Sequence, residues 1–308
     1  MKMRRLISAI IALLLVVNLS VTAFAAEWYL EDGDITVSAG DSGQTVSQGS
    51  STGVADNAPV IKQRDSSKTT DSTITISTSD NATANVTIQD INISSTGDAI
   101  DVGSSSANIT LEGDNKIYSE SGSALHVSDG DVTITGSGSL KAEIGDYEDN
   151  YNDNAKIGSH EDEDMSGKIH ITGSATVTTE DDGEDDFYGG DGAGIGSGYN
   201  GNMSGSITID ENAKVNAFSQ EDGAGIGSGE DGNMSGSITI SGNAQVTAGS
   251  GWDGAGIGAG ESDDDPPKSE MSGTITIGGN AKVTAWSEDS GAGIGAGEDG
   301  DVSAATRR

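Results

Sequence analysis

The hydrophobic residues of this chain recur in short apolar–polar–apolar triplets. One triplet, Ile207-Thr208-Ile209, returns as Ile238-Thr239-Ile240 and again as Ile275-Thr276-Ile277. Alternation with a period of two is typical of a strand that buries one face, so we expect the isoleucines to point inward and the threonines outward. After the N-terminal segment, no stretch of twelve residues keeps a helical apolar period. The pattern therefore predicts an all-β chain.

Each triplet belongs to a set of three phrases that recur together. The first phrase is Gly192-Ala193-Gly194-Ile195-Gly196, and its central isoleucine returns at positions 226, 257 and 294, in steps of 31, 31 and 37 residues. The Ile-Thr-Ile triplet is the second phrase, and Ala213-Lys214-Val215-Asn216-Ala217 is the third. Three short strands per period, joined by Gly, Asn, Asp and Ser turns without helices, predict a parallel β-helix with three strands in each coil.

Shorter versions of the same coil can be followed upstream. The second phrase returns there as Val86-Thr87-Ile88, Ile109-Thr110-Leu111, Val132-Thr133-Ile134 and Ile169-His170-Ile171. We therefore assign residues 81–308 to β-helix coils of about 23–38 residues, and residues 26–80 to an N-terminal cap with the first coils. The last glycine phrase is not followed by an Ile-Thr-Ile strand, so we expect an incomplete last coil. A larger parent polypeptide is one explanation.

Residues 1–25 have the composition of a secretory signal peptide. Lys2, Arg4 and Arg5 precede an apolar run from Leu6 to Val17, and Ala23-Phe24-Ala25 has the small residues of a cleavage site. No later segment is apolar over a membrane-spanning length, so we expect a secreted protein. Association with the cell surface after secretion is compatible with this prediction.

The charge of the chain narrows the classes of partner. Removal of the three cations Lys2, Arg4 and Arg5 lowers the net charge from −35 to −38. So acidic a surface disfavours binding to nucleic acid and can attract divalent cations. The chain has no cysteine, so disulfides cannot stabilise it.

Aromatic and acidic residues occur together between the third phrase and the next glycine phrase. The pairs are Phe187 and Tyr188 with Asp191, Phe218 with Asp222, Trp252 with Asp253, and Trp286 with Asp289. Aromatic faces can stack on sugar rings, and carboxylates are ligands for Ca²⁺. We predict a strip at equivalent corners of the coils, in which the aromatic residues bind carbohydrate and the aspartates bind Ca²⁺. The alternative is that Asp-Gly pairs simply form turns while the rings shield the edge of the core.

Other patterns give weaker signals. We expect an outward column of Thr87, Thr110, Thr133, His170, Thr208, Thr239 and Thr276, which the strand propensity of threonine explains better than ice binding does. The glycine phrase resembles a phosphate-binding loop, but no helix follows it, so we assign it to tight packing of the coils. His126, His160 and His170 are expected on different faces or corners and without a nucleophile partner, so we predict no catalytic residues.

The segment Asn85–Ala142 resembles a family of bacterial secreted carbohydrate-binding-domain proteins. The resemblance rests on Val86-Thr87-Ile88, Ile91-Asn92-Ile93, Gly97-Asp98-Ala99-Ile100 and Asp131-Val132-Thr133-Ile134. It implies a right-handed parallel β-helix related in shape to pectate lyases, binding to cellulose or acidic plant polysaccharides, and bound calcium. The Gly-Ala-Gly-Ile-Gly repeats are similar to those of large bacterial surface proteins. No calcium ligand of the family can be matched residue by residue.

We therefore expect an extracellular, non-catalytic polysaccharide-binding β-helix that uses Ca²⁺. A structural or adhesive surface repeat protein is the first alternative. A polysaccharide lyase is the second, although the arginines outside the signal segment, Arg64, Arg307 and Arg308, lie near the ends of the chain rather than along the coils.

Overall fold

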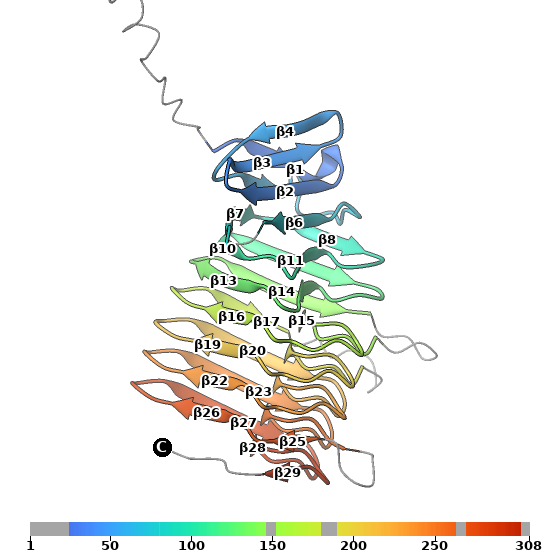
Figure 1. Cartoon of the computed structure of the whole chain (residues 1–308), viewed down its shortest axis with the longest axis vertical. Helices are drawn as coiled ribbons and strands as arrows, with labels where there is room; N and C mark the ends of the chain where they lie inside the picture. The colour runs from blue at the N-terminus through green and yellow to red at the C-terminus, as the bar shows by residue number, and fades with distance from the viewer. Residues whose placement is uncertain (1–24, 80, 146–151, 180–189, 263–268, 303–308) are drawn as a thin grey trace, which may run out of the picture.

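A computed structural model describes residues 25–79, 81–145, 152–179, 190–262 and 269–302. The predicted signal peptide, apart from its last residue, lies outside the described residues. Within them the chain winds into a stack of coils, and from β7 onward the coils contribute strands to all three of its long sheets (Figure 1). The chain is all-β and forms a parallel β-helix, as its sequence predicts.

Sheet A contains the Ile-Thr-Ile strands. Its strands, in order along the stack, are β1 (Glu27–Tyr29), β5 (Val60–Lys62), β7 (Ala84–Gln89), β10 (Ala107–Glu112), β13 (Asp131–Gly136), β16 (Lys168–Ile171), β19 (Ser206–Ile209), β22 (Ser237–Ile240) and β26 (Thr274–Ile277). Every neighbouring pair in this sheet is parallel.

Sheet C contains the strands of the third phrase, and all of its neighbouring pairs are parallel. Its strands are β8 (Asn92–Ser95), β11 (Asp114–Ser119), β14 (Ser139–Ile144), β17 (Thr176–Thr178), β20 (Lys214–Ser219), β23 (Gln245–Ser250) and β27 (Lys282–Ser287).

Sheet B contains the strands of the glycine phrase and its upstream equivalents. Its strands are β4 (Ser51–Ala55), β3 (Gly43–Gln48), β2 (Ile35–Gly40), β6 (Ile74–Thr78), β9 (Ile100–Gly103), β12 (Leu125–Val127), β15 (Ile157–Gly158), β18 (Ile195–Gly196), β21 (Ile226–Gly227), β24 (Ile257–Gly258) and β28 (Ile294–Gly295). Strands β25 (Glu270–Met271) and β29 (Asp301–Val302) form a separate pair, and η1 (Leu30–Asp32) is a short 3₁₀ helix.

The N-terminal end of the stack is closed by antiparallel strands. Strand β3 pairs antiparallel with β2 on one side and with β4 on the other. The hairpin of β3 and β4 lies at the N-terminal end of the stack in Figure 1, so β2, the first parallel strand of sheet B, does not form an open edge. No helix in the part of the chain that the structure describes is long and apolar enough to cross a membrane.

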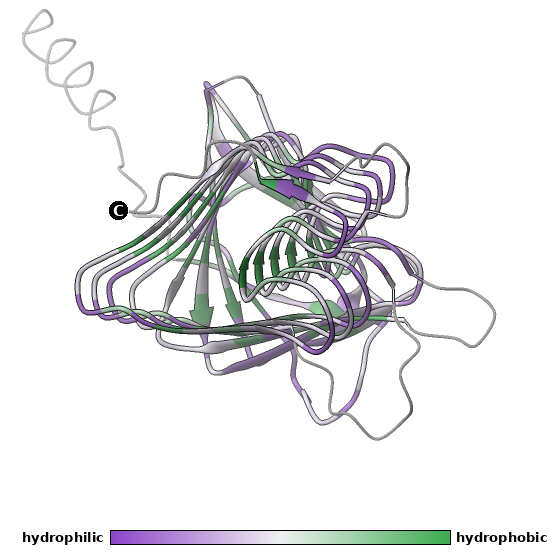
Figure 2. Ribbon diagram, turned by 90° about the horizontal axis from the view of Figure 1, so that it is seen from below, coloured by the Kyte–Doolittle hydropathy of each residue, from purple (hydrophilic) through white to green (hydrophobic). Residues whose placement is uncertain are grey.

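The core is a set of ladders in which like residues stack on like. Ile207 lies in register with Ile169 on one side and Ile238 on the other, and all three are fully buried. Figure 2, seen along the stack, shows equivalent strands superposed. Their isoleucines, valines and leucines form one buried core. Burial of one such side chain stabilises the fold by about 2 kcal/mol, so each coil depends on its neighbours.

Adjacent coils approach one another closely at the glycine phrase. Gly227 has φ +149°, and a Cβ atom placed on it would lie 1.7 Å from the carbonyl oxygen of Gly258 in the next coil. Gly196 and Gly258 repeat this contact with Gly227 and Gly295. Only glycine fits there, which supports the assignment of the phrase to packing rather than to a phosphate site.

The predicted threonine column is wrong in its register at one step. Thr110 pairs with Thr87 as expected, but on its other side it pairs with Thr135, while Thr133 pairs with Asn108 and His170. The shift is two residues, and a shift of two keeps every side chain on its own face of the strand. The alternation of apolar and polar residues therefore could not reveal it.

Candidate functional site

Two of the predicted aromatic residues meet on the outward face of sheet C. Phe218 and Trp286 lie on the same face of their strands as the exposed residues two and four positions before them. Their ring centroids are 5.5 Å apart at an interplanar angle of 35°. Gly249 lies between them in register with both. Because Gly249 has no side chain, the indole of Trp286 leans across it toward Phe218, so rings two coils apart form one surface.

The other predicted aromatic residues do not join this surface. Phe187 and Tyr188 lie outside the described residues. Trp252, whose side chain is 44% exposed, lies in the corner after β23, and its prediction as an equivalent of Phe218 and Trp286 is wrong. The backbone N–H of Trp252 donates to the carbonyl of Glu221, and the carbonyl of Trp252 accepts from Asp289, so these three residues form a column of their own.

Polar side chains extend the outward face of sheet C around Phe218 and Trp286. Lys214, Gln245 and Lys282 form one exposed row, and Asn216, Thr247 and Thr284 form the next. Earlier coils continue these rows. Thr176, Ser139 and Asp114 extend the row of Lys214, and Thr178, Lys141 and Lys116 extend the row of Asn216. The face therefore combines aromatic rings, lysines, amides and hydroxyls on a regular sheet, together with the carboxylates of Asp114 and Glu143 in its earliest coils.

Three of the four predicted aspartates form a ladder at one corner. The backbone N–H of Asp222 donates to Oδ1 of Asp191 at 3.4 Å, and that of Asp253 donates to Oδ1 of Asp222 at 2.9 Å. Asp153 precedes Asp191 in the same arrangement. Asp289 does not continue the ladder, because the next backbone N–H that donates to Asp253 belongs to Ser290. Asp289 has the matching residue type, but Ser290 has the matching position, since it precedes Ile294 by four residues as each ladder aspartate precedes its own isoleucine.

Further carboxylates crowd this ladder. One oxygen from each of Asp191, Glu221 and Asp222 lies within 4.8 Å of the others, and the same holds for Asp222, Asp253 and Glu261. Burial, together with Glu221 and Asp153, raises the pKa of Asp191 to about 7. The backbone donors relieve part of the repulsion. A divalent cation with a preference for oxygen ligands would relieve more.

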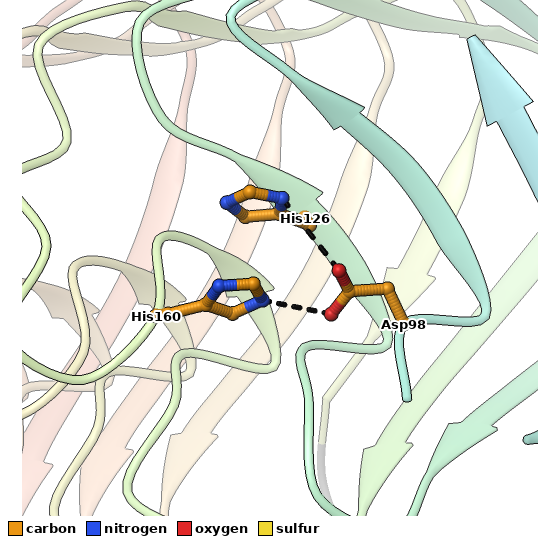
Figure 3. Close-up of side chains that lie close together, drawn as sticks. All are labelled: Asp98, His126 and His160. Carbon is orange, nitrogen blue, oxygen red and sulfur yellow. Dashed lines mark hydrogen bonds and ion pairs between the residues drawn. The ribbon is translucent and has the colours of Figure 1, made fainter. Parts of the chain in front are cut away.

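A second cluster, in three consecutive coils of sheet B, contradicts the prediction that His126 and His160 lie apart. Their rings stack with centroids 3.8 Å apart and an interplanar angle of 10°. Oδ1 of Asp98 lies 2.8 Å from Nε2 of His160, and Oδ2 of Asp98 lies 3.7 Å from Nδ1 of His126 (Figure 3). His170, in sheet A, instead contacts Asp210.

Carboxylates flank both sides of the histidine pair. Nδ1 of His126 lies 2.9 Å from Asp101, and its Nε2 lies 2.9 Å from Glu163. Burial disfavours the charged ring of His126, but its hydrogen bonds to Asp101 and Glu163 outweigh burial, so its pKa rises to about 9. The cluster thus contains two imidazoles and three carboxylates, and nothing in the search for motifs predicted it.

A signal for this cluster is nevertheless present in the repeat. Later coils read Gly196-Ser197-Gly198 and Gly227-Ser228-Gly229, whereas the first such coil reads Gly158-Ser159-His160. Strand β15 places Gly158 directly beside His126, so no side chain separates His126 from His160. The cluster could have been found as a departure from the repeat, combined with the correct register.

Comparison with known proteins agrees with the fold. A family model described as a β-helix repeat matches residues 207–230, 238–261 and 275–298. Each match begins at the first isoleucine of an Ile-Thr-Ile strand. Neither the curated proteins nor the solved structures include a match. The repeat match and the parallel sheets agree on a parallel β-helix.

Proposed function

We propose that this chain is an exported, non-catalytic β-helix that binds polysaccharide on the outward face of sheet C. The observation that carries the proposal is the joint surface of Phe218 and Trp286, which Gly249 makes possible. Aromatic rings side by side on a regular sheet suit the flat C–H faces of sugar rings. Amide and hydroxyl groups of Asn216, Thr247 and Thr284 offer hydrogen bonds to sugar hydroxyls.

The lysines of this face favour a polysaccharide that carries carboxylates. Lys116, Lys214 and Lys282 are exposed on it, although the chain as a whole has 50 acidic residues and only 15 lysines and arginines. These lysines, which belong to two adjacent rows, lower the repulsion that the rest of the protein exerts on an anionic polymer. A polymer of uronic acids, such as polygalacturonate, is therefore the preferred ligand in this proposal, ahead of neutral cellulose.

Calcium forms the second part of the proposal. The triads Asp191–Glu221–Asp222 and Asp222–Asp253–Glu261 supply the oxygen ligands that Ca²⁺ prefers, and their mutual repulsion gives a cation an electrostatic reason to bind. The ladder lies in the coils of Phe218 and Gly249, next to the coil of Trp286, so Ca²⁺ would stabilise the coils on which the aromatic surface rests. We do not assign Asp289 to this ladder.

Binding to immobilised polygalacturonate tests the proposal. The variant Trp286→Ala removes half of the aromatic surface, and Trp252→Ala removes an exposed tryptophan from a different column, which makes it a matched control. We expect Trp286→Ala to weaken binding about tenfold, which corresponds to about 1.4 kcal/mol, and Trp252→Ala to leave binding unchanged.

Two results would contradict the proposal. The first is the absence of binding to polygalacturonate, cellulose or other glycans, both with Ca²⁺ and with EDTA. The second is equal binding by the wild type and Trp286→Ala. Release of unsaturated sugars that absorb in the ultraviolet would show a lyase and overturn the non-catalytic part alone.

A further inference from the structure

We propose that Asp98, His126 and His160 bind a divalent first-row transition metal, with Zn²⁺ as the probe ion. This cluster lies in coils that precede the coils of Phe218 and Trp286, and in sheet B rather than sheet C. The inference is therefore independent of polysaccharide binding and of Ca²⁺ in the aspartate ladder.

The three side chains come from successive coils and lie close together. Asp98 precedes β9, His126 lies in β12, and His160 follows β15. One ligand atom from each lies within 4.8 Å of the other two. The parallel register of β9, β12 and β15 fixes the backbone under all three, so little conformational entropy is lost when an ion joins them.

The outer nitrogens of the two rings have the partner that metal-binding histidines need. Each ring turns one nitrogen toward Asp98 and the other toward Glu163, at 2.9 Å for Nε2 of His126 and 3.8 Å for Nδ1 of His160. A histidine that ligates a metal usually donates its second ring N–H to a carboxylate, which fixes the tautomer. Glu163 occupies that position for His126 and lies near the outer nitrogen of His160, beyond hydrogen-bonding distance.

The donor set selects the class of metal. Two imidazole nitrogens and a carboxylate suit Zn²⁺ and its first-row neighbours, whereas Ca²⁺ and Mg²⁺ take oxygen ligands. Asp101, whose side chain is 43% exposed, lies 2.9 Å from Nδ1 of His126 and is available as a further ligand. A doubly charged ion would also offset the repulsion among Asp98, Asp101 and Glu163.

The stacked rings must move slightly to take the ion. Two parallel rings 3.8 Å apart cannot both direct a nitrogen lone pair at one ion. His160 follows a strand of only two residues and is more exposed than His126, so it is the ring that turns. Metal binding should therefore end the ring stacking and shift the histidine resonances in an NMR spectrum.

The repeat supplies a matched variant for the test. In later coils glycine takes the place of His160, as Gly198, Gly229 and Gly260 show, so His160→Gly restores the common form of the coil. Asp222→Asn serves as the control variant, because it alters the aspartate ladder and leaves Asp98, His126 and His160 untouched.

Calorimetric titration of the full chain with Zn²⁺, and with Co²⁺ as a spectroscopic probe, tests the proposal in millimolar Ca²⁺. We expect one ion per chain in the wild type and in Asp222→Asn, a loss of at least about 100-fold in affinity in His160→Gly, and a loss of about 10–100-fold in Glu163→Gln. Equal thermal unfolding of the metal-free wild type and His160→Gly would show that the variant is folded.

Three outcomes would overturn the proposal. The first is a wild type that binds neither ion. The second is His160→Gly binding Zn²⁺ as tightly as the wild type does. The third is a Co²⁺ spectrum without the signature of nitrogen ligands.

Discussion

Gly249→Ala is the sharpest test of how the aromatic surface is built. A Cβ atom at this position would lie 2.5 Å from Cε2, 2.6 Å from Cζ2 and 3.0 Å from Cδ2 of Trp286. Carbon atoms in ordinary contact are about 3.5–4.0 Å apart, so the indole must retreat by about 1 Å and lose its contact with Phe218. No aromatic residue is removed, yet the joint surface is divided.

We expect Gly249→Ala to weaken polygalacturonate binding by about twofold to tenfold, since an aromatic pair contributes about 0.5–1.5 kcal/mol. Stability should change little, because the backbone at Gly249 is not in the left-handed region and alanine suits a strand better than glycine does.

Two measurements provide the assay. One is the affinity for polygalacturonate, and the other is the fluorescence emission of Trp286, obtained by subtracting the spectrum of the Trp286→Phe variant. A shifted emission of Trp286 with unchanged affinity would refute the idea that Phe218 and Trp286 act as one surface. An unchanged emission would refute the contact itself.

Three further predictions concern the fold and the aspartate ladder. Gly227→Ala should destabilise the chain by more than about 4 kcal/mol in urea unfolding, because its Cβ would meet a backbone oxygen that cannot move aside. Gly278→Ala is the control, because Gly278 has open space around it, and it should leave the urea midpoint nearly unchanged. Ile207→Ala should cost about 2–5 kcal/mol and Thr208→Ala less than about 1 kcal/mol in the same measurement. In EDTA, the folded chain holds the proton of Asp191 up to about pH 7 while the unfolded chain releases it near pH 4, so stability should fall as the pH rises between these values, by up to about 1.4 kcal/mol per pH unit. Asp191→Asn should remove this slope, and an equal slope in the variant would contradict the assignment.

The sequence predicts the fold well because every coil repeats the same physical solution. The alternation of Ile207, Thr208 and Ile209 fixes which residues face inward, and the common spacing of 31 residues fixes which coils stack. Asp191, Asp222 and Asp253 follow directly from that spacing, since each precedes its isoleucine by four residues. The aspartate ladder was therefore predictable except at Asp289.

Register and side-chain direction limit what the sequence can predict. The pairing of Thr110 with Thr135 depends on a shift of two residues, to which the apolar pattern is blind. Trp252 and Trp286 look alike in the sequence, yet one lies in a corner and the other within β27. Residue type alone does not distinguish these positions.

The histidine cluster also depends on strand register, which the sequence alone does not give. His126 and His160 lie 34 positions apart, in coils of different length, and their contact depends on the pairing of β12 with β15. A coil-by-coil alignment would show His160 where other coils have glycine. It would not show that Asp98 and Glu163 complete the cluster.

The most direct test of the central claim is a crystal structure of the chain with a bound galacturonate oligomer. The proposed function predicts sugar rings over Phe218 and Trp286, with carboxylates near Lys214 and Lys282. A sugar bound at the corner of Trp252, or on sheet A, would contradict it.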